Sequence, residues 1–211
     1  QKAKALIKTA ELQAHLERPT EAIATLKQVS SLPSVVAGTK VMVHKMLATA
    51  YLHQKNPSAA VAELSRISAL PGLTGYAKVS ALEESGDLLL SANVPAAARA
   101  EFEKALAVPP TEKSRFSHLH MKIGKSWRAE KNYVRAREAL QTAVGIEGAS
   151  SSYKEEAWQL LGDTLTEGKN YPAAIEAYQK VTTDPNASVF IKLNAALGLG
   201  NAARLAGDFG Q

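Results

Sequence analysis

The chain has 211 residues, of which 45% are hydrophobic and 21% charged, which predicts a buried core and excludes general disorder. Cysteine is absent, so disulfides, thiolate metal sites and cysteine nucleophiles are excluded. The net charge of +5 is only mildly basic and does not require a nucleic-acid partner. No run of about eighteen apolar residues occurs, so we expect no membrane-spanning segment. Because the chain begins at Gln1 without a methionine, we interpret it as a piece of a larger protein or as a processed form.

A repeat with a period of 38 residues runs through the chain. One column of the repeat holds only very small residues: Ala10, Ala48, Gly86, Gly124, Gly162 and Gly200. A second column is always alanine: Ala22, Ala60, Ala98, Ala136 and Ala174. A third holds a proline in four of five places: Pro33, Pro71, Pro109 and Pro185, with Glu147 as the exception. We therefore predict five full units, near 3–40, 41–78, 79–116, 117–154 and 155–192, and a partial unit over 193–211.

Each unit has the pattern of two helices joined by a tight turn. In the fifth unit, Trp158, Leu161 and Leu165 fall on one face of a first helix, and Ala174 and Tyr178 on one face of a second helix. Glycine inside a helix costs roughly 1 kcal/mol relative to alanine, so the small column predicts close helix packing at Gly86, Gly124, Gly162 and Gly200.

The turns and the last helix complete this pattern. Asn56 is typical of a helix N-cap, and Pro57 is typical of the first helical position. Three further residues occupy the repeat position of Asn56 and are expected to be N-caps as well: Asn132, Asn170 and Asp208. The helix over 191–205 is expected to cover the last exposed face of the stack, because repeats of this kind share one continuous core.

These columns resemble those of the tetratricopeptide repeat, whose pattern is matched in the fifth unit by Trp158, Leu161-Gly162, Ala174, Tyr178 and Pro185. The period departs from the usual value of about 34 residues. We interpret the four extra residues as one additional turn at the start of each first helix.

The resemblance implies an all-α fold: a right-handed α-solenoid of about five and a half repeats forming a single domain over 1–211, with a groove lined by first helices. It also implies a scaffold that binds a protein or peptide, without a cofactor and without catalysis, and it suggests a bacterial extracytoplasmic setting.

No catalytic signature appears, since G-x-S-x-G, HExxH and GxxxxGK[ST] are all absent. His44 and His120 occupy the Trp158 column and are expected to be packing residues. His15 and His53 are expected to face the groove one repeat apart, at about 10 Å. Zinc ligands lie at roughly 2 Å from the metal, so no metal site is predicted. The carboxylates at helical spacing are interpreted as solvated faces: Glu83, Glu84, Asp87, Glu155, Glu156 and Asp163.

The strongest candidate site is a basic stripe in the fourth repeat. Residues 113–137 hold eight lysines and arginines and one acid, Glu130. The stripe consists of four residues at i, i+3, i+7 and i+10: Arg115, His118, Lys122 and Lys125. The same region of the third and fifth repeats is acidic.

Two interpretations of the stripe remain open. In the first, adjacent helices neutralise one another; in the second, the stripe receives an acidic residue, a C-terminal carboxylate or a phosphate of a partner. We therefore carry three hypotheses for function: a non-enzymatic scaffold binding a protein or peptide, the repeat region of a multidomain enzyme, and a polyanion binder acting through the fourth repeat.

Overall fold

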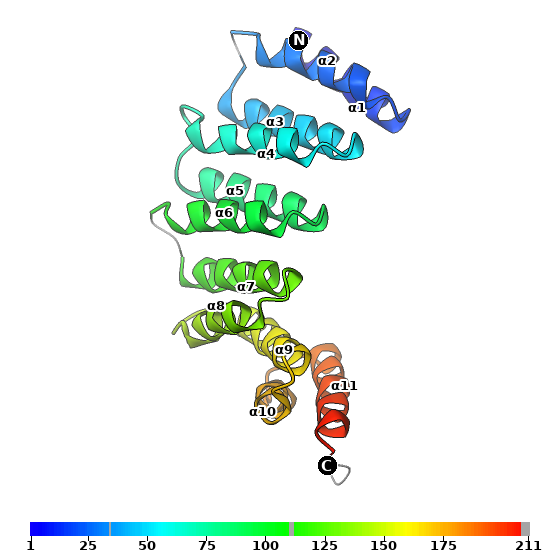
Figure 1. Cartoon of the computed structure of the whole chain (residues 1–211). Helices are drawn as coiled ribbons and strands as arrows, with labels where there is room; N and C mark the ends of the chain where they lie inside the picture. The colour runs from blue at the N-terminus through cyan, green and yellow to red at the C-terminus, as the bar shows by residue number, and fades with distance from the viewer. Residues whose placement is uncertain (34, 110–111, 208–211) are drawn as a thin grey trace. The chain divides into compact units, whose positions relative to one another are not determined.

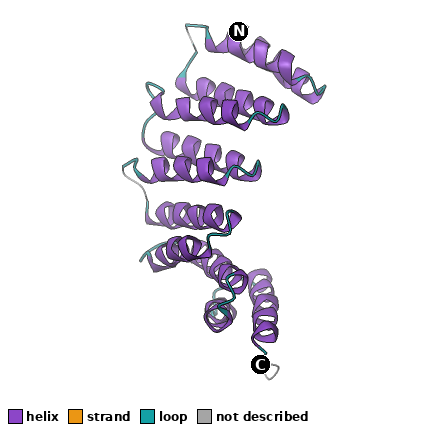
Figure 2. Cartoon of the chain, viewed as in Figure 1, coloured by secondary structure: helices purple, strands orange, loops and turns teal. Residues whose placement is uncertain are grey.

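The computed structural model describes residues 1–33, 35–109 and 112–207, and within these ranges every regular element is a helix (Figures 1 and 2). The elements in chain order are α1 (Lys2–His15), α2 (Pro19–Ser30), α3 (Ala37–His53), α4 (Pro57–Ser65), the 3-10 helix η1 (Arg66–Ala69), α5 (Gly75–Ser91), α6 (Pro95–Leu106), α7 (Lys113–Ala129), α8 (Tyr133–Gly145), α9 (Ser151–Glu167), α10 (Tyr171–Thr182) and α11 (Val189–Ala206). The predicted all-α solenoid of five helical hairpins and one further helix is confirmed.

The 38-residue period is kept by the helix starts. The first helices after α1 begin at residues 37, 75, 113, 151 and 189, and the second helices begin at 19, 57, 95, 133 and 171. Four of the first helices, α3, α5, α7 and α9, have 17 residues. They begin four residues ahead of the unit boundaries taken from the sequence, which is where the additional turn was expected.

The turn inside each hairpin is a helix C-terminal motif with a left-handed residue. Five residues other than glycine have φ between 57° and 62°, again at intervals of 38: Glu17, Lys55, Asn93, Lys131 and Lys169. The following backbone N–H closes each motif by donating to the carbonyl five residues back, as in Asn56 to Tyr51 at 2.9 Å. Gly207 continues the series with φ 79°.

The residue that follows the left-handed residue is the N-cap of the second helix. Asn56 Oδ1 accepts from the Ala59 N–H at 3.1 Å and Asn132 Oδ1 from the Arg135 N–H at 3.2 Å, so two of the four predicted caps are formed. Asn170 is also an N-cap, but its side chain makes no capping hydrogen bond. Asp208, the last member of this column, lies outside the described residues.

Glycines of α5, α7 and α9 face large residues of the second helix sixteen positions later. A Cβ atom placed on Gly86 would lie 2.3 Å from the Phe102 ring, and one on Gly124 would lie 2.6 Å from Leu140 Cγ. Gly162 has the same relationship with Tyr178. The prediction was wrong for Gly200, whose Cβ would meet no atom within 4 Å, because no described helix covers that side of α11.

The chain forms two compact units, residues 1–109 and 110–211, which we describe separately. In the first unit, α1 to α6 stack as three hairpins (Figure 1), and part of its core is formed by Ile7, Leu26, Val29 and Leu47. In the second, α11 packs on α10 and α9 and closes a core centred on Leu161, Tyr178 and Val181. The single domain over 1–211 stays a prediction.

Candidate functional site

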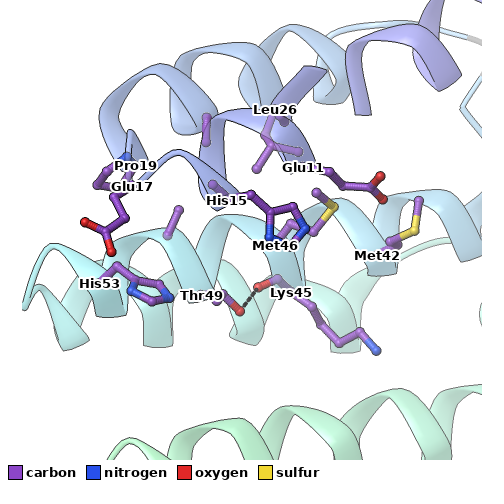
Figure 3. Close-up of a pocket in the computed structure, with 14 residues that line it drawn as sticks. Glu11, His15, Glu17, Pro19, Leu26, Met42, Lys45, Met46, Thr49 and His53 are labelled. Carbon is purple, nitrogen blue, oxygen red and sulfur yellow. Dashed lines mark hydrogen bonds between the residues drawn. The ribbon is translucent and has the colours of Figure 1, made fainter. Parts of the chain in front are cut away.

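The first unit contains a groove of about 530 Å³ between α1, α2 and α3 (Figure 3). Its floor is apolar and consists mainly of small or flexible side chains: Ala10, Ala14, Ala22, Leu26, Met42, Met46 and Ala50. Its rim is polar, with Glu11 and His15 on α1 and Lys45, Thr49 and His53 on α3. The groove can therefore enclose an apolar group and offer hydrogen-bonding partners around it.

The groove is open because small alanines line its α1 wall and flexible methionines line its α3 wall. Ala10 and Ala14 are one turn apart on α1, and Met42, Met46 and Ala50 follow the same four-residue spacing on α3. Alanines on one wall leave space that the methionines of the other wall fill only in part, since Met42 is 38% exposed. Met42 and Met46 were not predicted to line a groove, although apolar residues in groove-facing columns were a usable signal.

Charges on the rim are partly neutralised by neighbours. Glu11 pairs with Lys8 at 3.0 Å, and Lys45 pairs with Glu84 of α5. His15 and His53 are both exposed and both line the groove, as the sequence predicts. Among the described residues, no three histidine, aspartate or glutamate side chains are arranged to hold a metal ion.

The second unit contains a larger and more polar groove of about 710 Å³, lined by α7, α9 and α11. Lys125 Nζ lies 3.0 Å from Glu156 Oε1 across this groove. Arg128 makes two contacts with Glu167, at 2.6 and 3.0 Å, and lies 3.8 Å from Asp163. Hydrogen bonding to Glu167 is the main cause of the raised pKa of Arg128. Cations of α7 and carboxylates of α9 thus form inter-helix ion pairs.

The four residues of the predicted basic stripe all lie on α7 and are half-buried. The His118 ring stacks on Tyr153 of α9, with centroids 4.4 Å apart and planes 12° apart. Lys125 is a member of the α7–α9 ion pairs and lines the groove, whereas Arg115, His118 and Lys122 do not line it. Neutralisation between neighbouring helices therefore accounts for Lys125, and binding of a partner by the stripe stays a prediction.

The two histidines of the Trp158 column differ in their surroundings. His44 is buried, and its Nδ1 lies 3.0 Å from Glu63 Oε2, so a buried polar pair stands where the sequence predicted only packing. His120 is half-buried with its ring 5.0 Å from that of Phe116, and burial lowers its pKa below the ordinary value.

Two carboxylates of the expected solvated faces are also not solvated. Glu83 and Glu155 are each 8% exposed. The sequence pattern correctly predicted that Glu83 and Glu155 lie on first helices, α5 and α9. It did not predict that neighbouring residues would bury these two carboxylates.

Comparison with known proteins identifies the repeat. Residues 83–153 match one family model for the tetratricopeptide repeat, and residues 155–183 match another. No curated protein sequence matches the chain. No helix in the described part of the chain is long and apolar enough to cross a membrane.

Solved structures with the same fold share little sequence with this chain. MamA from Desulfovibrio magneticus RS-1 is 18% identical over 85% of this chain and 93% of its own, with a TM-score of 0.53. A Podosopora anserina kinesin light chain protein with nearly identical TPR-like repeats is 15% identical over 95% and 96%, with a TM-score of 0.57. PilW, a type IV pilus biogenesis factor, is 16% identical over 99% and 88%, also with a TM-score of 0.57. The repeats within residues 83–183 therefore match tetratricopeptide repeats in sequence, and the chain shares its helical-repeat fold with these solved structures.

Proposed function

We propose that the chain is a non-catalytic scaffold that binds a segment of another protein, and that the groove of the first unit holds an apolar side chain of that segment. Tetratricopeptide repeats are typically interaction modules, and stacked repeats offer extended surfaces for partners. The observation that carries the proposal is the apolar floor between two consecutive first helices. Its volume of about 530 Å³ falls within the usual range of binding pockets.

The chemistry of the groove defines the segment it fits. Met42 and Met46 are flexible and polarisable, so they can adapt to an aliphatic or aromatic side chain. Glu11 and Glu17 give the rim acidic groups. We therefore expect a segment with an apolar anchor flanked by basic or neutral residues.

The experiment uses random 12-residue peptides displayed on phage and selected on the immobilised chain. Enriched peptides should share a large apolar residue, and a synthetic consensus peptide should bind the chain in a fluorescence anisotropy titration. Ala14→Trp fills the groove from an exposed position on α1 and should weaken binding at least tenfold. Ala24→Trp adds the same ring to an exposed position on α2 outside the groove and should leave binding unchanged.

Equal affinity of the Ala14→Trp and Ala24→Trp chains for the consensus peptide would contradict the groove assignment. Circular dichroism of both variants confirms that they fold. A selection without any enriched sequence would contradict the proposed function itself.

A second candidate is an acidic partner segment that meets Arg115, His118, Lys122 and Lys125. The observation in its favour is the concentration of eight lysines and arginines in residues 113–137. Such a segment would compete with Glu156 for Lys125. Binding of a fluorescent oligoglutamate probe should then fall steeply with salt, and Lys122→Glu with Lys125→Glu should slow its association. Equal association rates for the double variant and the unchanged chain would exclude this site.

A further inference from the structure

Glu155 of α9 is a buried acid that lines the polar groove of the second unit. It is 8% exposed, and its carboxylate forms no hydrogen bond or ion pair with any residue in the described ranges. Lys154 of α9 and Lys192 of α11 are outside the lining of the groove and do not pair with it in the described structure. Burying a carboxylate without a partner is costly, so such groups in folded proteins normally have one. The position of Glu155 therefore indicates a partner group from outside the described chain.

The other charged residues of this groove already have partners. Lys125 pairs with Glu156 at 3.0 Å, and Arg128 lies 3.8 Å from Asp163. Among the described residues that line the groove there are three carboxylates and two cations, and neither cation pairs with Glu155. The groove therefore has one negative charge without a counter-ion, and a ligand with a positive charge would be complementary to it.

The remaining lining of the groove suits the side chain of a lysine or arginine. Phe190 and Ile191 of α11 can pack against the methylene stem of such a side chain. Asn186 and Asn194 also line the groove, and neither side-chain amide has a hydrogen-bond partner among the described residues. These amides can both donate and accept, so they can pair with the peptide backbone beside the basic residue. A protein segment offers the charge, the stem and the backbone together, which favours it over a small free amine.

We propose that the groove of the second unit binds a segment of a partner protein through a lysine or arginine side chain, and that Glu155 is the buried counter-ion of that side chain. A charge-assisted hydrogen bond from the cation would give the carboxylate the partner that the described chain does not supply. This inference rests on the proposed scaffold function but not on the groove of the first unit. Each of the two sites can therefore fail without the other.

The probe is a peptide selected against this groove alone. Random 12-residue peptides displayed on phage are first depleted on a chain carrying Ala14→Trp and Glu155→Gln, and then selected on the Ala14→Trp chain, whose groove in the first unit is filled. The surviving peptides should share a lysine or arginine, and their synthetic consensus peptide should bind the Ala14→Trp chain in an anisotropy titration. Norleucine in place of the shared basic residue keeps an apolar stem without the charge, and should weaken binding at least tenfold.

Variants of the chain test the counter-ion itself. Glu155→Gln keeps the shape of the side chain and removes its charge, so the consensus peptide should bind this variant at least tenfold more weakly. Glu176→Gln is the matched control, because Glu176 is exposed on α10 and does not line the groove. The same change of net charge at Glu176 should leave peptide binding unchanged.

Thermal unfolding gives a readout that does not require a peptide. Without any ligand, Glu155→Gln should leave the melting temperature unchanged or raise it, because it removes a buried charge that has no partner in the described structure. The consensus peptide should raise the melting temperature of the chain with Glu155 and should not raise that of the Glu155→Gln variant.

Three outcomes would overturn the proposal. The first is a selection in which no basic peptide survives the depletion step; if peptides are still enriched on the unchanged chain, the scaffold function stands and the Glu155 site alone is rejected. The second is a lower melting temperature of the Glu155→Gln chain without ligand, which would mean that the carboxylate stabilises the fold itself. The third is binding of spermidine as tight as that of the peptide and lost in Glu155→Gln, which would assign the site to a free polyamine.

Discussion

The ring of Tyr178 lies directly against the backbone of Gly162, so that a methyl group at Gly162 would come within 2.6 Å of Tyr178 Cε1. Gly198 confines the same ring from α11, and the hydroxyl donates to Asp163 Oδ1 at 2.7 Å. Burial, followed by this hydrogen bond, raises the pKa of Tyr178. The ring has no room to move, so the absence of a side chain at Gly162 is a packing requirement.

Gly162→Ala is expected to lower the free energy of unfolding by about 1–3 kcal/mol, because overpacking outweighs the better helix propensity of alanine. Gly200→Ala is the control at the same repeat position. With open space around it, this change should raise the free energy of unfolding by about 0.5–1 kcal/mol. Urea denaturation of both variants measures the difference, and changes of the same sign would contradict the helix register.

Glu63 and Glu101 occupy the same repeat position, but only Glu63 has partners for both oxygens. Glu63 meets His44 at 3.0 Å and Arg66 at 2.8 Å, while Glu101 Oε1 meets Lys104 at 2.6 Å and its Oε2 has no hydrogen-bond partner in the described structure. Leu82 stands in the third repeat where His44 stands in the second.

Glu63→Ala should therefore lower the free energy of unfolding by roughly 1–3 kcal/mol, because it leaves His44 buried without its partner. Glu101→Ala should be neutral or stabilising, since it removes an unpaired buried oxygen and introduces the residue found at the same position in Ala139 and Ala177. Thermal unfolding followed by circular dichroism compares the two. A larger loss for Glu101→Ala would show that its carboxylate has a partner after all.

Lys125 and Glu156 allow a charge-reversal test of the α7–α9 contact. Both side chains are partly exposed, so Lys125→Glu should lower the free energy of unfolding by only about 0.5–1 kcal/mol, and adding Glu156→Lys should restore it. Urea denaturation at low and high salt measures both variants, and the effect should shrink at high salt. Failure of the second change to restore stability would mean that the pair contributes nothing to folding.

His120 gives the fold a pH dependence of known sign. Burial lowers its pKa below the ordinary value of about 6.5, so the unfolded chain binds more protons between these two pKa values. The contribution of His120 to stability is full above about pH 6.5 and is lost as the pH falls toward the lowered pKa. Melting temperatures measured between pH 7.5 and 5 should fall less for His120→Gln than for the unchanged chain. His53→Gln, at an exposed position, is the control.

Sequence reasoning predicted the features that depend on spacing. The period placed the hairpins, and Asn56 with Pro57 marked a helix start where one was found. The small column correctly predicted close packing at Gly86, Gly124 and Gly162. These features are local or repeat at a fixed interval, so the residue types alone carry the information.

The features that sequence reasoning missed depend on pairs of residues brought together by packing. The partner of His44 is nineteen positions away on α4, and neither residue is unusual in its own helix. The groove beside Met42 and Met46 exists because the alanines of α1, Ala10 and Ala14, leave space between α1 and α3. For the basic stripe, the charge of Lys125 was visible in the sequence, but its pairing with Glu156 required the relative placement of α7 and α9.

Three features recur every 38 residues: the left-handed turn residues, the helix starts, and the contacts of a glycine with a large side chain of the second helix. This common interval restricts which insertions and deletions the fold can accept. Deleting a block such as residues 151–188 joins equivalent positions, so each remaining residue keeps a neighbour of the same class. Adding a single residue inside a first helix rotates everything after it by about 100° relative to the turn that follows. The fold therefore tolerates gain or loss of a whole hairpin far better than gain or loss of one residue within a helix.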